Sequence, residues 1–280
     1  MKRNLHNLLV LACIAVSCSA TWAGTIYGNN ATGGAPYVYV FDSATGAISN
    51  VITNLSGING RGVVVVNNIM YYTTATTNSV YSYNLTTSTD MGSLFTVPSG
   101  ALSTMAFDGT NFWIGDYSGT NHAYLYSPTG TLLNTISLAD CTGFCDGLEY
   151  FVDGGGNARL ISNEGDGGTP GIYDVYSTTG ALITHDFINT GDASGTGIAY
   201  DGTDFYVSNI FQKTITVYDN TGAFIRTESL TGYGDNTPLV EDLSANYALV
   251  LTDTPEPGTF AMLGAGLLGL LGAVKSRKRS

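Results

Sequence analysis

Apolar and polar residues alternate in short stretches throughout the chain between Gly24 and Thr252, and turn residues separate these stretches at regular intervals. Aromatic and β-branched residues dominate them, which is typical of β-strands that are packed on both faces. No long segment of this region shows the 3.6-residue periodicity of an amphipathic helix. The pattern therefore predicts a single all-β domain over residues 24–252.

Two sequence segments recur along this domain. One combines alternating aromatic residues with a turn that ends in Gly, and it occurs at 37–46, 122–130, 172–180 and 215–222, with a degenerate copy at 80–87. The other contains an Asp-Gly turn, and its copies Met105–Ile114 and Ile198–Val207 match almost residue for residue, with looser copies at 63–72 and 148–161. Asp-Gly pairs favour tight hairpins, because Gly accepts a positive φ. Each unit is therefore predicted to contain four antiparallel strands.

The spacing of these units predicts a β-propeller. Gly130, Gly180 and Gly222 end three of the turns and are 50 and 42 residues apart, and propeller blades repeat every ~40–50 residues. The 229 residues of 24–252 then supply about five blades. A two-sheet sandwich is the other all-β architecture considered, and the repeat disfavours it.

The ends of the domain predict how the ring closes. Leu239–Leu243 and Tyr247–Leu251 resemble the first two strands of a blade, and Tyr37–Thr53 resembles the third and fourth. Their union would remove two exposed sheet edges. A further strand predicted at Thr25–Gly28 leaves six blades as an alternative.

The C-terminal segment has three parts in a fixed order. Pro255, Glu256 and Pro257 come first, 260–274 follows without a charged residue, and a basic tail ends the chain with Lys275, Arg277, Lys278 and Arg279. This order resembles the PEP-CTERM sorting signal of Gram-negative bacteria. The resemblance implies recognition of Pro255-Glu256-Pro257 by an exosortase, a transmembrane segment over 260–274, and delivery to the cell surface or extracellular matrix.

The apolar part of this tail leaves two simpler alternatives open. It contains 15 residues, whereas a helix that spans a bilayer needs ~20. An ordinary tail anchor or a buried C-terminal helix would also use such a segment. The basic residues that follow it agree with the positive-inside rule for a cytoplasmic end.

The N-terminus predicts export as well. Lys2 and Arg3 precede an apolar stretch at 8–16, and small residues lead up to a cleavage site between Ala23 and Gly24, a pattern typical of a secretory signal peptide cut by signal peptidase. The chain is thus expected to contain a signal peptide (1–23), a propeller-like domain (24–252) and a sorting signal (253–280). Attachment to the membrane can be transient or stable.

Charge excludes nucleic acid as a partner. Six of the ten Lys and Arg residues lie in the two terminal segments, so residues 24–252 carry 20 acidic and four basic residues, a net charge of −16. Binding to nucleic acid depends on neutralisation of phosphates by Lys and Arg. Neutral polymers and cations are compatible partners, although acidic residues also keep an exported protein soluble.

Candidate chemistry is sparse. The two histidines of the domain, His122 and His185, lie in different units, and no GxSxG, HExxH, Walker or CxxC motif is present. This favours a non-catalytic surface or matrix protein that binds polysaccharide or protein, with Tyr117 and Tyr233 as candidate sugar-stacking residues. The alternative is a secreted propeller enzyme, a hydrolase or lyase that acts on matrix polymer.

Two further groups of residues have candidate roles. Cys141 and Cys145 are the only cysteines between Gly24 and the C-terminus, and they are expected to form a small disulfide in an oxidising compartment. Glu149 aligns with Ala106 and Ala199 of other units, and Glu241 or Asp242 falls in the same register within one residue. These three carboxylates are candidate ligands for Ca²⁺ in the central channel. Hydration of the carboxylates, or bonds to backbone amides, is the simpler alternative, and no other cofactor is expected.

Overall fold

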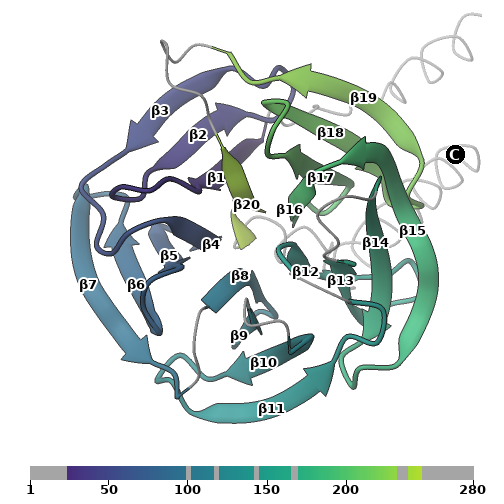
Figure 1. Ribbon diagram of the computed structural model, residues 1–280, viewed down its shortest axis with the longest axis horizontal. Helices are drawn as coiled ribbons and strands as arrows, with labels where there is room; N and C mark the ends of the chain where they lie inside the picture. The colour runs from purple at the N-terminus through teal and green to yellow at the C-terminus, as the bar shows by residue number, and fades with distance from the viewer. Residues whose placement is uncertain are drawn as a thin grey trace, which may run out of the picture.

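Five four-stranded antiparallel sheets form a closed ring, so the predicted five-bladed β-propeller is confirmed (Figure 1). The computed structural model describes residues 24–98, 102–116, 120–141, 145–164, 170–231 and 239–247. The strands in chain order form four blades and the larger part of a fifth. Successive strands in each blade run from the axis of the ring to its rim.

The closing blade joins the two ends of the domain. It consists of β20 (Val240–Ser244), β1 (Thr25–Asn30), β2 (Val38–Asp42) and β3 (Ile48–Ile52), from the axis outward. The other blades are numbered 2 to 5. Blade 2 contains β4 (Gly60–Val66), β5 (Ile69–Thr74), β6 (Ser79–Asn84) and β7 (Thr89–Thr96), and blade 3 contains β8 (Leu102–Phe107), β9 (Phe112–Asp116), β10 (His122–Tyr126) and β11 (Leu132–Ser137). Blade 4 contains β12 (Leu148–Val152), β13 (Ala158–Asn163), β14 (Pro170–Ser177) and β15 (Leu182–Ala193), and blade 5 contains β16 (Gly195–Tyr200), β17 (Asp204–Asn209), β18 (Thr214–Asp219) and β19 (Phe224–Ser229).

Ring closure differs from the sequence prediction in one strand. β1 pairs with β20, with Gly28 opposite Leu243, and occupies the second place in the closing blade. The strand predicted at Thr25–Gly28 therefore belongs to this blade, and the six-blade alternative is wrong. The second place in this blade, predicted for Tyr247–Leu251, is taken by β1. Of that segment only Tyr247 lies within the described residues.

The Asp-Gly pairs form the predicted turns. In blade 5, Asp201 Oδ1 accepts hydrogen bonds from the backbone N–H groups of Thr203 and Asp204, both at 2.8 Å. Gly202, which directly follows Asp201, has a φ of +98°, which a residue with a Cβ adopts only with strain. The Asp side chain and the Gly backbone together fix the hairpin between β16 and β17.

The hydrophobic core lies between neighbouring blades. The inner strands of the blades are buried on both faces, as blade 3 illustrates: Met105 packs in a cluster that includes Val64 of blade 2, whereas Trp113 packs with Leu148 of blade 4. This explains why successive strand residues are apolar or aromatic. Full burial of one large apolar side chain contributes roughly 1.5–3 kcal/mol, so the five inter-blade clusters are the main stabilising feature of the ring.

The inner strands approach each other closely at glycines. A Cβ built on Gly197 of β16 would lie 2.3 Å from the Cα atom of Asp242 on β20, and one on Gly147 would lie 2.1 Å from the carbonyl oxygen of Thr196. Side chains at these positions would force the strands apart. The small radius of a five-bladed ring thus depends on glycine at these contacts.

The terminal segments lie outside the described residues. This applies to the predicted signal peptide at 1–23 and to the predicted sorting segment at 253–280, including 260–274. Within the part of the chain that is described, no helix has both the length and the apolar character that crossing a membrane requires.

Candidate functional site

The first strands of the five blades, β20, β4, β8, β12 and β16, surround the axis of the ring (Figure 1), and polar side chains tie these inner strands together. Asp242 of β20 accepts backbone N–H bonds from Val63 of β4 at 3.0 Å and from Met105 of β8 at 3.1 Å. Thr104 Oγ1 of β8 accepts a bond of 3.0 Å from the backbone N–H of Leu148 on β12. Burial raises the pKa of Asp242 well above its ordinary value. These side chains serve as cross-links between blades.

Glu149 of β12 lies in the buried interior and accepts hydrogen bonds from three donors. Its Oε1 accepts bonds from the backbone N–H of Tyr150 and from the hydroxyl of Tyr247, and its Oε2 accepts the backbone N–H of Tyr200 at 3.0 Å. The side chain is only 1% exposed. Burial raises the pKa of Glu149 to about 8, although the three donors act in the opposite direction. Desolvation therefore outweighs hydrogen bonding, and the group is mostly neutral at pH 7.

A buried ion pair lies where the inner strands begin. Arg61 Nη1 of β4 is 2.5 Å from Glu241 Oε1 of β20, and Ser103 Oγ is 3.4 Å from Asp146 Oδ1. Burial, together with the nearby Glu241, raises the pKa of Asp146 to about 8, although Arg61 acts in the opposite direction. Arg61 thus pairs with Glu241 and places a positive charge near Asp146.

The three candidate Ca²⁺ ligands have separate environments. Glu149 contacts Tyr247, Glu241 pairs with Arg61, and Asp242 binds the backbone of two other blades. The predicted register was also wrong. The Ser244 hydroxyl accepts a hydrogen bond from the backbone N–H of Val65 in the next blade, and Glu149 accepts the corresponding bond from the backbone N–H of Tyr200 in its own next blade. Ser244 is therefore the residue of β20 that is equivalent to Glu149. The error arose because β20 lacks the Asp-Gly turn that anchors the alignment elsewhere. Binding of Ca²⁺ by these residues stays a prediction.

Cys141 and Cys145 are joined by a disulfide, with their Cα atoms 6.0 Å apart. Both residues are buried in the hydrophobic cluster between blades 3 and 4. The bond therefore closes a short loop that leads from β11 into β12. Tyr117 and Tyr233, the predicted sugar-stacking residues, lie outside the described residues.

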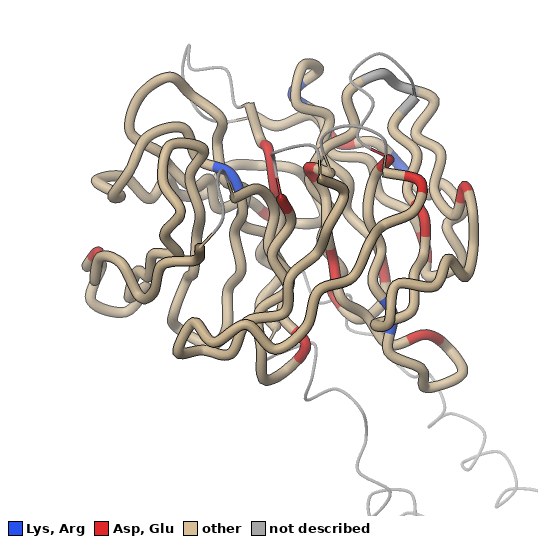
Figure 2. Tube along the Cα trace, turned by 60° about the horizontal axis from the view of Figure 1, so that its bottom comes forward, with Lys and Arg blue, Asp and Glu red and all other residues tan. Residues whose placement is uncertain are grey.

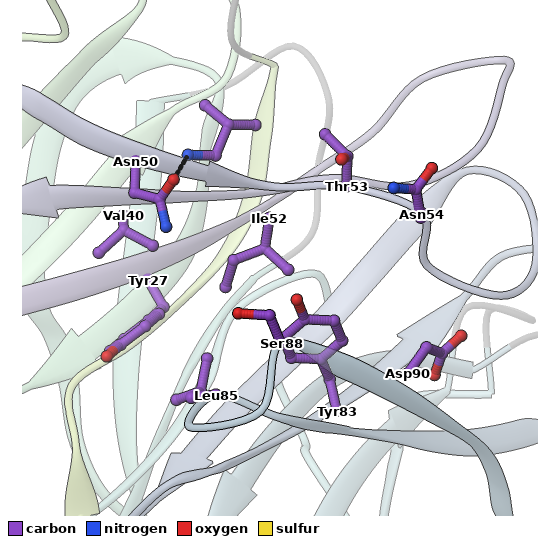
Figure 3. A pocket seen from close by; sticks show the side chains of 11 residues that line it. Tyr27, Val40, Asn50, Ile52, Thr53, Asn54, Tyr83, Leu85, Ser88 and Asp90 are labelled. Atoms are coloured by element: carbon purple, nitrogen blue, oxygen red, sulfur yellow. Dashed lines mark hydrogen bonds between the residues drawn. The ribbon is translucent and has the colours of Figure 1, made fainter.

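A groove of about 490 Å³ opens between the closing blade and blade 2 (Figure 3). Its walls come from β1, β2 and β3 with the segment that follows, and from the β6–β7 hairpin. The lining residues are Tyr27, Val40, Asn50, Val51, Ile52, Thr53, Asn54, Tyr83, Leu85, Ser88 and Asp90. A volume of this size is typical of small-molecule and cofactor sites.

The groove combines aromatic rings with amide and hydroxyl groups and has no basic side chain in its lining. Asn50 Oδ1 accepts the backbone N–H of Val51 at 2.8 Å, and Figure 3 shows its amide nitrogen on the side of Val40 and Tyr27. Asp90, at the other end, binds the hydroxyl and the backbone N–H of Ser56 at 2.7 and 2.9 Å. The arrangement can donate and accept hydrogen bonds beside an aromatic surface.

The sequence contained one signal for the groove. The copy of the first repeated segment at 80–87 lacks the turn Gly, and in the structure Ser88 has the positive φ, +53°, of that turn. The departure from the repeat marks the hairpin that forms one wall. The other wall could not be found by the same reasoning, because it comes from a different blade.

Comparison with known proteins concerns the tail and the fold separately. Residues 253–278 match the PEP-CTERM protein-sorting motif. This motif implies export in a Gram-negative bacterium and processing by an exosortase. No curated protein matches the chain.

Solved structures show similarity in the fold alone. A chain of the nidogen/laminin complex aligns with a TM-score of 0.52 and 11% identity over 80% of this chain and 99% of that chain. A glutaminyl cyclase of Myxococcus xanthus aligns with a TM-score of 0.46 and 15% identity over 71% of this chain and 76% of that chain.

Proposed function

We propose that this protein is an exported cell-surface or matrix component whose propeller binds a neutral polysaccharide without catalysis. The groove between the closing blade and blade 2 is the observation that supports this function. In this proposal signal peptidase removes residues 1–23 and an exosortase processes the segment 253–280. The folded propeller is then presented outside the cytoplasm.

The chemistry of the groove suits a hydroxyl-rich, uncharged ligand. Sugar rings expose C–H groups on one face, which pack on aromatic rings such as that of Tyr27, and hydroxyls on their edges, which bind amides such as that of Asn50. An acidic polymer would need cationic partners, and the groove lining offers none. Asp and Glu positions far outnumber Lys and Arg positions over the described propeller (Figure 2). A neutral polysaccharide is therefore favoured over an acidic one.

The enzyme alternative has less support. The buried carboxyl groups near the axis are engaged in bonds to backbone N–H groups, to Arg61 or to Tyr247. His185 pairs with Asp140, Glu164 and Asp186, which belong to blade 4 and its entry loop, and these ion pairs include none of those carboxyl groups. No described pair of groups combines an acid and a base in the groove.

A glycan array tests the proposal directly. The purified protein is expected to bind neutral glycans and to leave acidic ones unbound, and incubation with the bound polymers is expected to release no product. Release of shorter or unsaturated oligosaccharides would support the hydrolase or lyase alternative. Failure to bind any neutral glycan, together with binding to a purified surface protein, would replace the polysaccharide by a protein partner.

A further inference from the structure

A cluster of metal-ligating side chains lies on blade 4, apart from the groove. His185 of β15 is surrounded by carboxylates from three segments: Asp140 between β11 and β12, Glu164 after β13, and Asp186 beside His185. The ligand atoms of Glu164, Asp174, His185 and Asp186 all lie within 4.8 Å of one another. An imidazole nitrogen and several carboxylate oxygens thus converge on one small space.

The distances fit a single metal ion. His185 Nε2 is 3.6 Å from Asp140 Oδ2 and 3.6 Å from Glu164 Oε1. These separations are too long for hydrogen bonds. Two ligands of a tetrahedral ion with metal–ligand distances of about 2.0–2.2 Å lie about 3.3–3.6 Å apart. Each of the two oxygens therefore lies as far from Nε2 as a second ligand of the same ion would lie.

The second nitrogen of His185 is held by a carboxylate. Its Nδ1 lies 2.7 Å from Asp186 Oδ1, and Asp174 Oδ1 accepts the backbone N–H of Asp186 at 2.8 Å. A histidine that ligates a metal through one nitrogen commonly donates its other N–H to a carboxylate, which fixes the tautomer. With its Nδ1–H bound to Asp186, His185 has its free lone pair on Nε2, the nitrogen near Asp140 and Glu164.

The local backbone brings these groups together. The β14–β15 ladder has an irregularity between Tyr173 and Val175, opposite the segment that contains His185 and Asp186, and Asp186 has a φ of +52°. Glu164, Asp174 and Asp186 place three carboxylate groups within 4.8 Å of one another, and a cation at this position would offset their mutual repulsion. His185 remains 55% exposed, so an ion can enter from solvent.

We propose that Asp140, Glu164 and His185 bind a divalent transition-metal ion of the zinc class, with Asp186 as the residue that orients His185. One imidazole with carboxylates favours Zn²⁺ over Ca²⁺, which prefers an all-oxygen shell of six to eight ligands. The ion links the loop that follows blade 3 to the end of β13 and to β15 in blade 4. The site is independent of the groove and of the proposed sugar ligand.

Calorimetric titration of the purified metal-free protein with ZnCl₂ tests the site. One Zn²⁺ ion per chain is expected to bind, and His185→Ala is expected to lower the affinity at least 100-fold. Asp186→Asn should lower it roughly 10- to 100-fold, as substitutions of residues that orient metal ligands do. His122→Ala is the matched control, because it removes the other histidine of the propeller and should leave the affinity unchanged. CaCl₂ is expected to bind much more weakly than ZnCl₂.

Thermal unfolding separates loss of the site from loss of the fold. All four proteins should unfold at similar temperatures without metal, and Zn²⁺ should raise the Tm of the unsubstituted protein and of His122→Ala but not that of His185→Ala. Equal Zn²⁺ affinity in the His185→Ala and unsubstituted proteins would overturn the proposal. So would the absence of any Zn²⁺ binding.

Discussion

Replacement of Glu149 by Gln is expected to change how the stability of the propeller depends on pH. Glu149 has a pKa of about 8 in the folded protein because of burial, against an ordinary value of 4.5. The folded state therefore holds a proton that the unfolded chain releases above about pH 4.5. The stabilising contribution of the protonated group is complete below pH 4.5 and is lost as the pH rises through 8. The Glu149→Gln variant lacks this pH dependence, because a glutamine amide does not titrate in this range.

The size of the effect follows from the pKa difference. Each pKa unit corresponds to about 1.4 kcal/mol, so the shift from 4.5 to about 8 is equivalent to about 5 kcal/mol. Between pH 5 and pH 8, the unsubstituted protein should lose stability relative to Glu149→Gln by about 1.4 kcal/mol per pH unit. At pH 5 the variant should be the less stable protein, because Glu149 accepts hydrogen bonds through both carboxyl oxygens, from Tyr150, Tyr200 and Tyr247, and an amide has only one oxygen to accept them.

Urea unfolding at each pH unit from 5 to 9 measures this difference, with the fluorescence of buried Trp113 as the probe. Asp219→Asn is the control, because Asp219 is exposed and its hydrogen bonds with Thr221 and Ala223 lower its pKa. The ionised Asp219 carboxylate stops contributing to stability only as the pH falls below the ordinary carboxyl range. Above pH 5, the stability of Asp219→Asn should therefore depend on pH as that of the unsubstituted protein does. Parallel stability curves for Glu149→Gln and the unsubstituted protein would refute the assignment of a neutral Glu149.

Two further substitutions test the ring and the tail. Gly197→Ala should destabilise the propeller by about 3 kcal/mol or more, since its Cβ would lie 2.3 Å from the Cα atom of Asp242. The control Gly154→Ala has no atom within 4 Å of the new Cβ and should change the urea midpoint little. Equal losses of stability in both variants would contradict the close approach of β16 and β20. Replacement of Pro255, Glu256 and Pro257 by Ala should abolish exosortase processing. A protein with an epitope on the propeller should then stay in the membrane fraction at its unprocessed size. Normal processing of this variant would contradict the role of the motif.

The repeat in the sequence was sufficient to predict the blades. The Asp-Gly pairs at 108–109 and 201–202 and the Thr-Gly turns define where each hairpin bends, and these turns are local features that a short segment fixes by itself. Closure was predicted in outline, but its second strand was not. Tyr247–Leu251 and Thr25–Asn30 both alternate like strands, and only the pairing with β20 decides between them.

Contacts between blades were beyond sequence reasoning. Glu149 was recognised as unusual in its column, yet its partners Tyr200 and Tyr247 come from 51 and 98 residues away. The same holds for Arg61, which meets Glu241 only because the ring closes. The groove also assembles from two blades, and the His185 cluster from blade 4 and the loop that leads into it. Sequence periodicity reports the structure within a blade, and the candidate sites lie between blades or between their loops.

The central claim is that the groove binds a neutral polysaccharide, and equilibrium binding to a glycan selected on the array tests it most directly. Tyr27→Leu and Asn50→Leu remove a ring and an amide from the groove lining, whereas Phe224→Leu removes an exposed ring from the outer strand β19. Each groove substitution is expected to weaken binding roughly 10-fold or more, in line with the 1–3 kcal/mol of an unmade polar contact, and Phe224→Leu should leave it unchanged. Equal affinity in all four folded proteins would contradict the claim.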